Sequence, residues 1–321
     1  MTETVDLRRL DGATVLVLGA AGFIGSHLTD RLLQLGAKVV GMDNFATSDG
    51  SNLAHLDGQN DFEFVEADII EGIPYSDDAD FVAHLASPAS PPDYLSEPLF
   101  TLRTGSAGTD NALEFALARS ARFLLASTSE VYGDPEVHPQ TESYWGRVNP
   151  IGPRSVYDEA KRYAEAITME FHRSHNLDIG IARIFNTYGP RMRVADGRAI
   201  PNFFAAAMAD KPLPVYGDGS QTRSLCFVSD MVEGLGLMLA SNATGPVNLG
   251  NTHEVTMLEL ATSVQDAVGN YPGLEYRELP IDDPSRRQPD TTIAHELLGW
   301  APTVSLADGL SMTREWFEVT P

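Results

Sequence analysis

Cysteine and long apolar runs are nearly absent from this chain of 321 residues. Cys226 is the one cysteine, which excludes an intrachain disulfide and predicts a reducing compartment. No window reaches the roughly 18 consecutive apolar residues that a membrane span requires, and the N-terminus lacks a basic region followed by a cleavable apolar segment. We therefore expect a cytoplasmic protein without a membrane partner.

Positive charge is also scarce. The chain has 22 Lys and Arg against 45 Asp and Glu, which gives a formal net charge of −23. This balance argues against nucleic acid or an anionic membrane as a partner, because phosphate groups are bound by basic surfaces. It does not exclude an anionic small ligand, which needs only a local cluster of arginines. The residues suggest no metal site.

The N-terminal segment has the pattern of a dinucleotide-binding unit. Residues 13–18 form a short apolar run that predicts a buried parallel strand, and a helical pattern follows over 22–35. Between them lie Gly19, Gly22 and Gly25, whose spacing allows a tight turn, close backbone approach to a pyrophosphate and close helix–strand packing. The start of the helix supplies free N–H groups to the phosphates.

The next predicted strand, residues 38–43, ends in Asp43. A carboxylate at this place accepts hydrogen bonds from the adenosine ribose and repels a 2′-phosphate, which favours NAD over NADP. The residues that we expect to bind the cofactor are Gly19, Gly22, Phe23, Ile24, Gly25, Asp43, Asn44, Asp68, Leu85, Ser87, Thr104, Tyr157 and Lys161.

Strand-like and helical segments alternate along the chain. Strands are predicted at 13–19, 38–43, 62–66, 79–85, 122–127 and 178–184, and helices at 22–35, 98–119 and 155–174. This alternation predicts an α/β fold with a doubly wound, Rossmann-type parallel sheet, and places ligands at the carboxyl ends of its strands. We expect an NAD-binding domain that carries the catalytic residues over 1–186 and a smaller nucleotide-sugar-binding lobe over 187–321, with possible crossing of the chain between the two.

Tyr157 and Lys161 lie four residues apart in a predicted helix, so the phenol and the ammonium can point into one cavity. A free phenol has a pKa of about 10, and a nearby positive charge lowers it. Such a pair can take a proton from an alcohol while hydride leaves its carbon. The spacing alone is common on surface helices, but only three lysines occur in the chain beside 19 arginines. Hydroxyl and carboxylate groups precede the pair in residues 127–133 (STSEVYG).

Together these motifs resemble the extended short-chain dehydrogenases/reductases. More specifically, residues 85–92 (LASPASPP), 126–149, 184–192 (IFNTYGPRM) and 219–223 (GSQTR) resemble UDP-glucuronate decarboxylases, also called UDP-xylose synthases. The similarity extends over nearly the whole chain. The glycine loop and the Tyr–Lys spacing are shared by the superfamily, whereas the S-P-A-S-P-P and T-S-E-V-Y-G-D-P segments are specific within it.

The resemblance implies a mechanism with permanently bound NAD. Tyr157 would deprotonate the sugar C4 hydroxyl, and Lys161 would hold the cofactor ribose. Thr128 matches the residue that hydrogen-bonds the C4 oxygen, and Ser129 and Glu130 match the pair beside the sugar ring. The resulting 4-keto acid loses CO2, and reduction of the ketone gives UDP-xylose; without it, UDP-4-keto-pentose is released.

The resemblance also assigns the substrate site and the assembly. Asn186, Arg223 and Arg287 match residues that hold the pyrophosphate and the sugar, since arginine forms bidentate bonds with phosphate. Tyr216 is expected to pack on uracil. The full expected set is Ser90, Asn186, Arg191, Tyr216, Gln221, Arg223 and Arg287. The predicted helices 98–119 and 155–174 match those that pair in superfamily dimers, which implies a homodimer.

Other functions stay open at this point. Similar 4,6-dehydratases carry Thr-Asp-Glu where this chain has Thr128, Ser129 and Glu130, because expulsion of water needs an acid beside the base. A 4-epimerase needs neither Glu130 nor the substrate carboxylate. A non-catalytic NAD-binding sensor or scaffold is an alternative of another class, although it need not retain the complete set of catalytic residues.

Three features depart from the family pattern. Gly105 stands where the family usually has Asn, which supports the geometry of the active-site helix and a proton relay. Leu117-Ala118 replaces a basic pair, and residues 47–51 (TSDGS) replace a basic stretch. These departures bear on substrate affinity and on the final reduction, and they lead to the hypothesis that some turnovers release UDP-4-keto-pentose and NADH.

Overall fold

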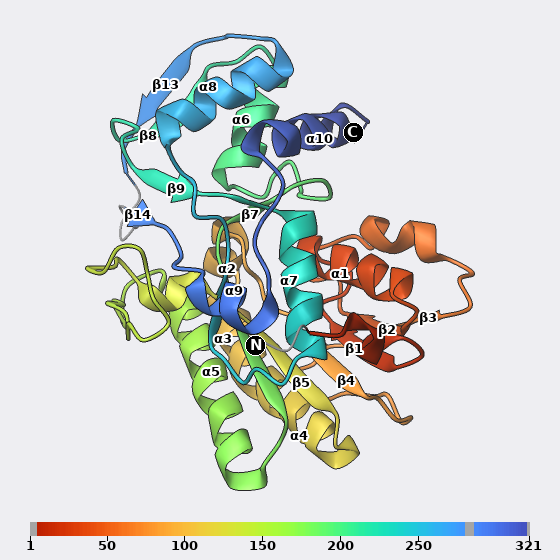
Figure 1. Ribbon diagram of the computed structural model, residues 1–321. Helices are drawn as coiled ribbons and strands as arrows, with labels where there is room; N and C mark the ends of the chain where they lie inside the picture. Colours follow the sequence, from red (N-terminus) through yellow and green to blue (C-terminus); the bar gives the residue numbers. More distant parts are fainter. Residues whose placement is uncertain (1–4, 280–285, 320–321) are drawn as a thin grey trace.

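The central element of the protein is a parallel sheet of seven strands (Figure 1). The computed structural model describes residues 5–279 and 286–319. In spatial order the strands are β11 (Val247–Leu249), β6 (Ile179–Ile184), β5 (Arg122–Thr128), β4 (Phe81–His84), β1 (Thr14–Leu18), β2 (Lys38–Asp43) and β3 (Phe62–Glu66). The predicted α/β fold class is confirmed, and the six predicted strands are all present.

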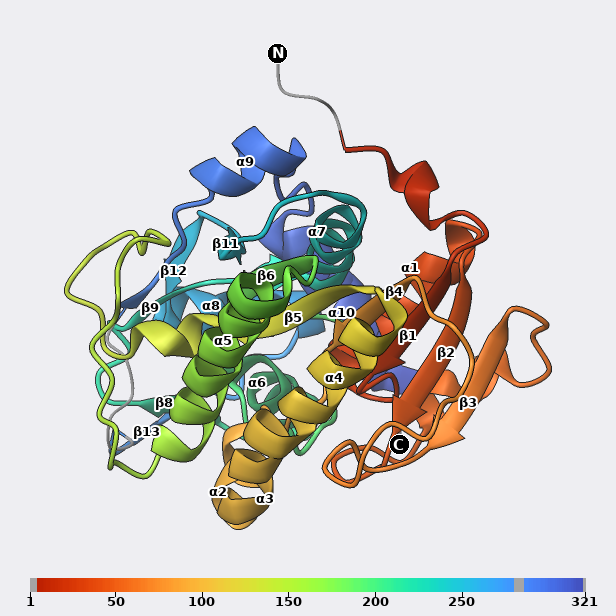
Figure 2. The same cartoon turned by 90° about the horizontal axis from the view of Figure 1, so that it is seen from below.

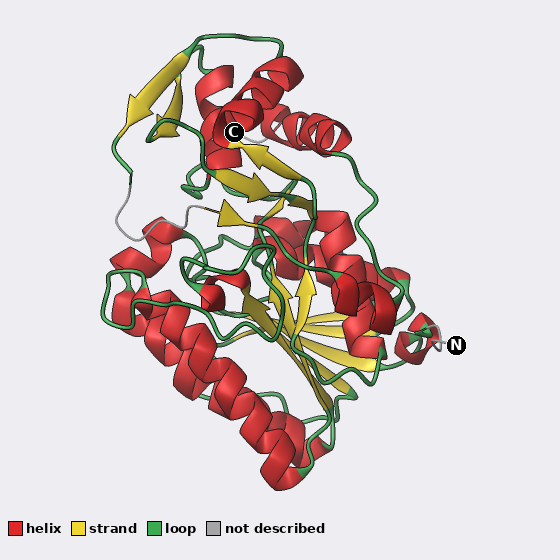
Figure 3. Ribbon diagram, turned by 60° about the vertical axis from the view of Figure 1, so that its left-hand side comes forward, coloured by secondary structure: helices red, strands yellow, loops and turns green. Residues whose placement is uncertain are grey.

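Helices cover both faces of the sheet (Figure 3). On one face, α1 (Phe23–Gln34) and α7 (Val228–Ala240) pack against inward-pointing residues such as Val15 and Val17. On the other, α4 (Thr109–Arg119) and α5 (Ser155–His175) pack against Leu16 and Leu18. Successive side chains of a strand point to opposite faces, so a continuous apolar run is what a strand buried on both faces requires.

The helix predicted over 98–119 is present but interrupted. It consists of α3 (Pro98–Arg103), a π-helical turn (Thr104–Gly108) and α4. The short helix α2 (Pro91–Ser96) precedes it, and Ser90 caps this helix by accepting from the N–H of Asp93. Figure 2 shows this helical segment beside α5 beneath the sheet.

The second half of the chain builds a smaller lobe above the sheet (Figure 1). Its helices are α6 (Ala199–Met208), α8 (Met257–Val268) and α10 (Leu306–Val319), whereas α9 (Thr292–Leu298) packs against α7 and strand β11 (Val247–Leu249) of the large sheet. Its short strands are β7 (Thr187–Tyr188), β8 (Leu213–Tyr216), β9 (Thr222–Ser224), β10 (Cys226–Phe227), β12 (Glu254–Thr256), β13 (Leu274–Arg277) and β14 (Arg286–Arg287), arranged in three small sheets. Short 3-10 helices lie at Leu7–Leu10, Ser51–Leu56 and Ser129–Tyr132.

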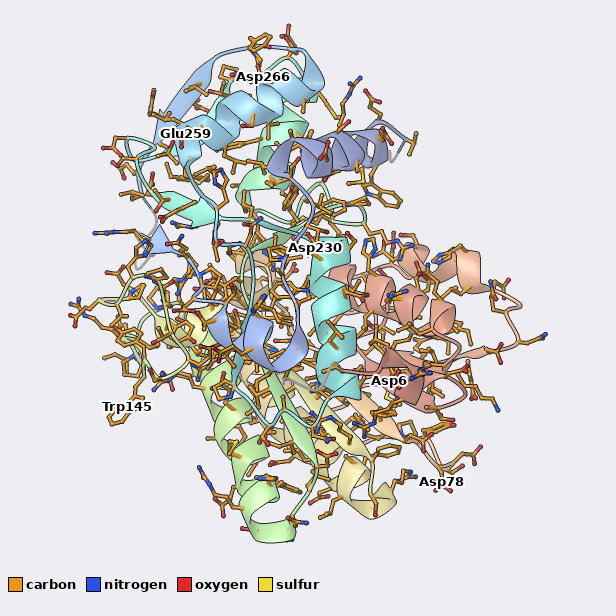
Figure 4. All side chains as sticks on the ribbon, viewed as in Figure 1. Asp6, Asp78, Trp145, Asp230, Glu259 and Asp266 are labelled. Atoms are coloured by element: carbon orange, nitrogen blue, oxygen red, sulfur yellow. The ribbon has the colours of Figure 1, made fainter. Side chains whose placement is uncertain are left out.

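The chain crosses between the two parts after residue 187. Helix α7 and strand β11 return to the large sheet, where β11 pairs with β6. Buried Asp230 of α7, labelled in Figure 4, then fixes the path back to the lobe. Its carboxylate accepts the backbone N–H groups of Thr303 and Val304 at 3.0 and 2.9 Å. In the described part of the chain no helix has the length and apolar composition of a membrane-spanning segment.

Candidate active site

A large cavity of about 1240 Å³ lies between the sheet and the smaller lobe. Gly19, Leu85, Thr128 and Ile184, at the carboxyl ends of β1, β4, β5 and β6, line its floor. The ends of parallel strands meet at one edge of the sheet, so residues far apart in the sequence converge there.

Most of the residues predicted from the sequence lie on the wall of this cavity. They are Gly19, Gly22, Phe23, Ile24, Gly25, Leu85, Ser87, Ser90, Thr128, Ser129, Glu130, Tyr157, Lys161, Asn186, Arg191, Tyr216, Gln221, Arg223 and Arg287. The other four, Asp43, Asn44, Asp68 and Thr104, are not among the lining residues. Thr104 is instead buried in the π-helical turn, where its hydroxyl donates to the Phe100 carbonyl at 2.9 Å.

The glycine loop leaves room that a side chain would fill. Gly19 has a φ of +83°, and a Cβ there would come within 2.7 Å of the backbone nitrogen of Ala86. A Cβ on Gly25 would overlap the Gly19 carbonyl oxygen. Helix α1 begins with no side-chain cap at Gly22, so its first N–H groups stay available at the cavity. This arrangement fits a diphosphate, because the N-terminus of a helix attracts negative charge.

Asp43 connects the glycine loop to β2. Its carboxylate accepts the N–H of Ala21 at 3.0 Å and of Phe45 at 2.9 Å. Burial raises the pKa of Asp43, and these N–H groups partly oppose the rise. Beside it, the Asn44 amide donates to Asp68 at 3.1 Å. Asp43 and two other predicted cofactor-binding residues, Asn44 and Asp68, thus lie together at the end of β2, and their role in binding stays a prediction.

Tyr157 and Lys161 lie in the first turns of α5, and both are buried. Burial raises the pKa of Tyr157 to about 12, although a hydrogen bond with the Thr128 hydroxyl and the Arg198 charge work in the opposite direction. Burial also lowers the pKa of Lys161 to about 8. The Lys161 ammonium donates to the Ala126 carbonyl at 2.8 Å. The phenol therefore needs a further positive charge to act as a base near neutral pH.

Sequence reasoning missed Tyr94, which lies against the predicted base. Its ring stacks on that of Tyr157 with 5.3 Å between centroids and 10° between planes. Tyr94 belongs to α2, which begins at Pro91 within the proline-rich segment 88–92, and it is 2% exposed. Its position after a strand-end loop was the available signal, but an aromatic residue there is also compatible with ordinary core packing.

Glu130 lies between two arginines. Its Oε2 accepts from Arg154 at 2.8 Å and from Arg287 at 3.2 Å. Burial by itself raises the pKa of Glu130, but the charges of Arg287 and Arg154 outweigh this effect, so the pKa is lowered overall. Arg287 is 1% exposed and also donates to the Ser129 carbonyl at 2.7 Å. Glu130 is thus held as a carboxylate. Arg154 was missed, although it stands one helical turn before Tyr157.

Predicted substrate residues from the second half of the chain line further parts of the cavity wall. Arg191 donates to Asp30 of α1 at 2.6 Å, and no described residue accepts from its other, buried terminal nitrogen. The Gln221 amide donates to the Tyr216 carbonyl at 2.7 Å. Tyr216 is 36% exposed at the rim, which leaves its ring accessible to a ligand. The arginine pattern fits an anionic ligand.

Comparison with known proteins identifies the family. The sequence profile described as GDP-mannose 4,6 dehydratase matches residues 16–313. UDP-glucuronic acid decarboxylase 2 of Arabidopsis thaliana is 52% identical over 301 residues, which is 94% of this chain and 67% of the plant protein. The chain belongs to the UDP-glucuronic acid decarboxylase family. This confirms the resemblance to UDP-glucuronate decarboxylases, a family of extended short-chain dehydrogenases/reductases, that the sequence motifs indicated.

Solved structures support the fold and place the family among related activities. An epimerase from Methanothermobacter thermautotrophicus matches with a TM-score of 0.88 and 32% identity, covering 97% of this chain and 94% of its own. A UDP-glucuronic acid 4-epimerase from Bacillus cereus, in complex with UDP-glucuronic acid and NAD, matches with a TM-score of 0.84 and 29% identity over 95% and 99% of the two chains. The decarboxylase is thus considerably more similar in sequence than either epimerase.

Proposed function

We propose that this member of the decarboxylase family converts UDP-glucuronate to CO2 and UDP-xylose through a UDP-4-keto intermediate, with NAD retained at the glycine loop. The observation that carries the proposal is the convergence of Thr128, Glu130, Tyr157 and Lys161 on the cavity wall that also contains the glycine loop. A sensor or scaffold would need the loop but not this set of groups.

Tyr157 is the base of the first step. Its hydroxyl takes the proton of the sugar C4 hydroxyl, while the C4 hydrogen leaves with its electron pair. The burial that raises the pKa of Tyr157 to about 12 also excludes water, so a positive charge introduced beside the ring acts strongly on the phenol. Thr128 orients the phenol by hydrogen bonding. Lys161, fixed by the Ala126 carbonyl, contributes its charge and remaining N–H groups.

The glycine loop, the start of α1 and Asp43 are the groups that would hold NAD. Bound NAD would supply a reversible hydride acceptor for C4 and, in its oxidised form, a positively charged ring. The carboxylate of Asp43 favours a ribose with a free 2′-hydroxyl, and therefore NAD over NADP.

The pair of arginines around Glu130 governs the second step. Once C4 is a ketone, the C5–C6 bond breaks, CO2 leaves and the electron pair forms an enolate over C4 and C5. Arg287 supplies positive charge near this developing charge, and Glu130 keeps the guanidinium in place. A proton taken up from solvent then adds to C5 in place of the lost CO2. Ser129 at the middle position suits this reaction, because no hydroxyl has to be expelled.

The smaller lobe is proposed to bind the UDP part. Arg223 and Arg191 would bind the diphosphate, and Tyr216 at the rim would pack on uracil. We also propose a homodimer through α5 and the neighbouring α3–α4 segment. The outer side of α5 supports this, because Tyr163 is 41% exposed there.

Tyr157→Phe tests the proposed function most directly. Loss of the phenol should reduce release of labelled CO2 from UDP-[6-14C]-glucuronate by about 10³-fold, since general acid–base groups contribute roughly 10²–10⁴-fold. The matched control is Tyr271→Phe, which makes the same change at a tyrosine that is 64% exposed and lies outside both the cavity wall and the proposed dimer face, and it should leave the rate unchanged. Unchanged CO2 release by Tyr157→Phe would contradict the proposed base.

The same assay separates the alternatives. Consumption of UDP-glucuronate without CO2 release by the natural protein would favour the 4-epimerase, and turnover of dTDP-glucose alone would favour the 4,6-dehydratase. Accumulation of the reduced cofactor in proportion to CO2 would show that UDP-4-keto-pentose is released instead of UDP-xylose.

A further inference from the structure

The π-helical turn at Thr104–Gly108 lies against the catalytic helix. It sits between α3 and α4, and hydroxyl side chains in the turn and at the start of α4 donate to carbonyls one turn earlier. The Ser106 hydroxyl donates to the Leu102 carbonyl at 2.6 Å, and the Thr109 hydroxyl donates to the Gly105 carbonyl at 2.9 Å. A π turn adds one residue to the helical path, and such turns often occur at functional sites.

Gly105 is the residue of this turn that contacts α5. A Cβ at position 105 would lie 2.6 Å from the Cβ of Ala160 and 3.0 Å from the Ala160 carbonyl oxygen. Cβ atoms do not approach this closely, so any larger residue at position 105, asparagine included, requires α5 to move away. The space between the two helices therefore holds one Cβ, and Ala160 provides it.

Ala160 occupies a sensitive place in α5. It precedes Lys161 directly and lies one turn after Tyr157. Both side chains have little freedom, since Lys161 donates to the Ala126 carbonyl at 2.8 Å and Tyr157 is stacked on Tyr94 at 5.3 Å. A rigid shift of α5 would thus move both groups relative to β5, which carries Ala126 and Thr128. Misplacement by about 1 Å can reduce a rate roughly 10²-fold.

We infer that Gly105 is a positioning residue: its lack of a side chain lets α5 approach the π turn closely enough to set Tyr157 and Lys161 in register with the end of β5. The inference rests on the catalytic roles proposed above for Tyr157 and Lys161. The contact has a particular signature, because its shortest approach, 2.6 Å, is between the Cβ atoms of the two residues and can be relieved from either position.

The test exchanges the Cβ between the two positions. Gly105→Ala should lower kcat by about tenfold to 10²-fold with little change in KM for UDP-glucuronate. Ala160→Gly should keep most of the activity. The double variant Gly105→Ala/Ala160→Gly removes the 2.6 Å contact and leaves the Ala160 carbonyl oxygen at 3.0 Å, so kcat should recover in large part. Thermal unfolding of each variant is measured alongside.

Gly108→Ala is the matched control within the same turn. A Cβ there would meet the end of the Ile69 side chain at 2.7 Å, which is flexible and does not belong to α5. Its kcat should stay close to the natural value even if stability falls. The inference would be overturned if Gly105→Ala had the same kcat as the natural protein, or if the double variant had a kcat as low as that of Gly105→Ala. Tyr157→Phe separates failure of this inference from failure of the proposed function. If that variant kept its activity, Tyr157 would not be the base.

Discussion

The two ends of the cavity are lined by different chemical groups. At the cofactor end, glycines and backbone N–H groups form the wall, and Asp43 is held by two backbone N–H groups. At the sugar end, charged side chains dominate, and Glu130 is shared between Arg154 and Arg287. The first end depends on what the chain omits, namely Cβ atoms. The second depends on a balance of charges with little access to water.

This difference has consequences for sensitivity to mutation. A backbone site is disturbed mainly by added volume, because its hydrogen-bonding groups are present in every residue. A buried charge network is disturbed by the loss of one member, because the remaining charge stays desolvated without its partner. We therefore expect removal of a charge at the sugar end to affect catalysis more than removal of a charge at the cofactor end.

Arg287→Gln should have the largest effect of the substitutions that probe this contrast. The variant loses positive charge beside the enolate, and kcat should fall by about 10²-fold or more. Burial raises the pKa of Glu130 and Arg287 lowers it, so without Arg287 this pKa rises. The acid limb of the kcat–pH profile should accordingly move to higher pH, as measured by initial rates of CO2 release.

Arg286→Gln is the control for this substitution, since Arg286 is the adjacent, exposed arginine and carries the same charge. It should leave both kcat and the profile in place. Equal losses in the two variants would show that overall charge matters, and not the buried network.

Asp43→Asn probes the cofactor end and should have a smaller effect. The Kd for NAD should rise by about tenfold to 10²-fold, because a hydrogen bond to a charged group contributes roughly 1.5–3 kcal/mol. At saturating NAD, kcat should stay nearly unchanged. Asp57→Asn alters an exposed acid that does not line the cavity and serves as the control. A fall in kcat at saturating NAD would contradict the expectation that the cofactor end affects binding and not the chemical steps.

Asp158→Asn addresses stability and should have the smallest effect on catalysis. Burial and then the Glu130 charge raise the pKa of Asp158 from 3.8 to about 7, and Oδ1 has no partner among the described residues. Between these values the folded state binds more protons than the unfolded state, so the free energy of unfolding falls as pH rises through this range. The variant should gain about 2 to 4 kcal/mol at pH ~8 and little at pH ~4.

Thermal or urea unfolding at the two pH values measures this difference. Glu159→Gln is the control, because the neighbouring side chain is 37% exposed and pairs with Arg162 at the surface. A pH-independent change in Asp158→Asn would mean that the carboxyl does not titrate in this range in the folded protein.

The sequence predicted the first half of the fold closely, for a physical reason. Apart from the edge strand β3 (FEFVE), in which apolar and acidic residues are mixed, each strand up to β6 is a short, mainly apolar run flanked by turn residues. A strand buried on both faces needs no information from distant segments. Strand β11 was missed because it has only three residues, Val247–Leu249, which are too few for a pattern. The π-helical turn was missed because its glycines resemble ordinary small residues of a helix.

The cofactor end could be located from sequence in the same way. Its glycines, Asp43 and the start of α1 are close together along the chain, so spacing determines their geometry. At the sugar end, the family resemblance predicted Glu130 and Arg287 as separate site residues but did not predict the contact between them. Their contact joins residues that are 157 positions apart, and the contribution of Arg154 depends on how α5 leaves the loop before it.

By itself, the sequence determined the alternation of strands and helices, the glycine loop and the Tyr157–Lys161 spacing, because these follow from local backbone preferences and from the period of a helix. Only the tertiary structure decided which arginines pair with Glu130, which ring stacks on Tyr157 and which glycine lets α5 pack closely against the π-helical turn. Those relations depend on distances between separate elements, and such distances are fixed by packing of the whole core.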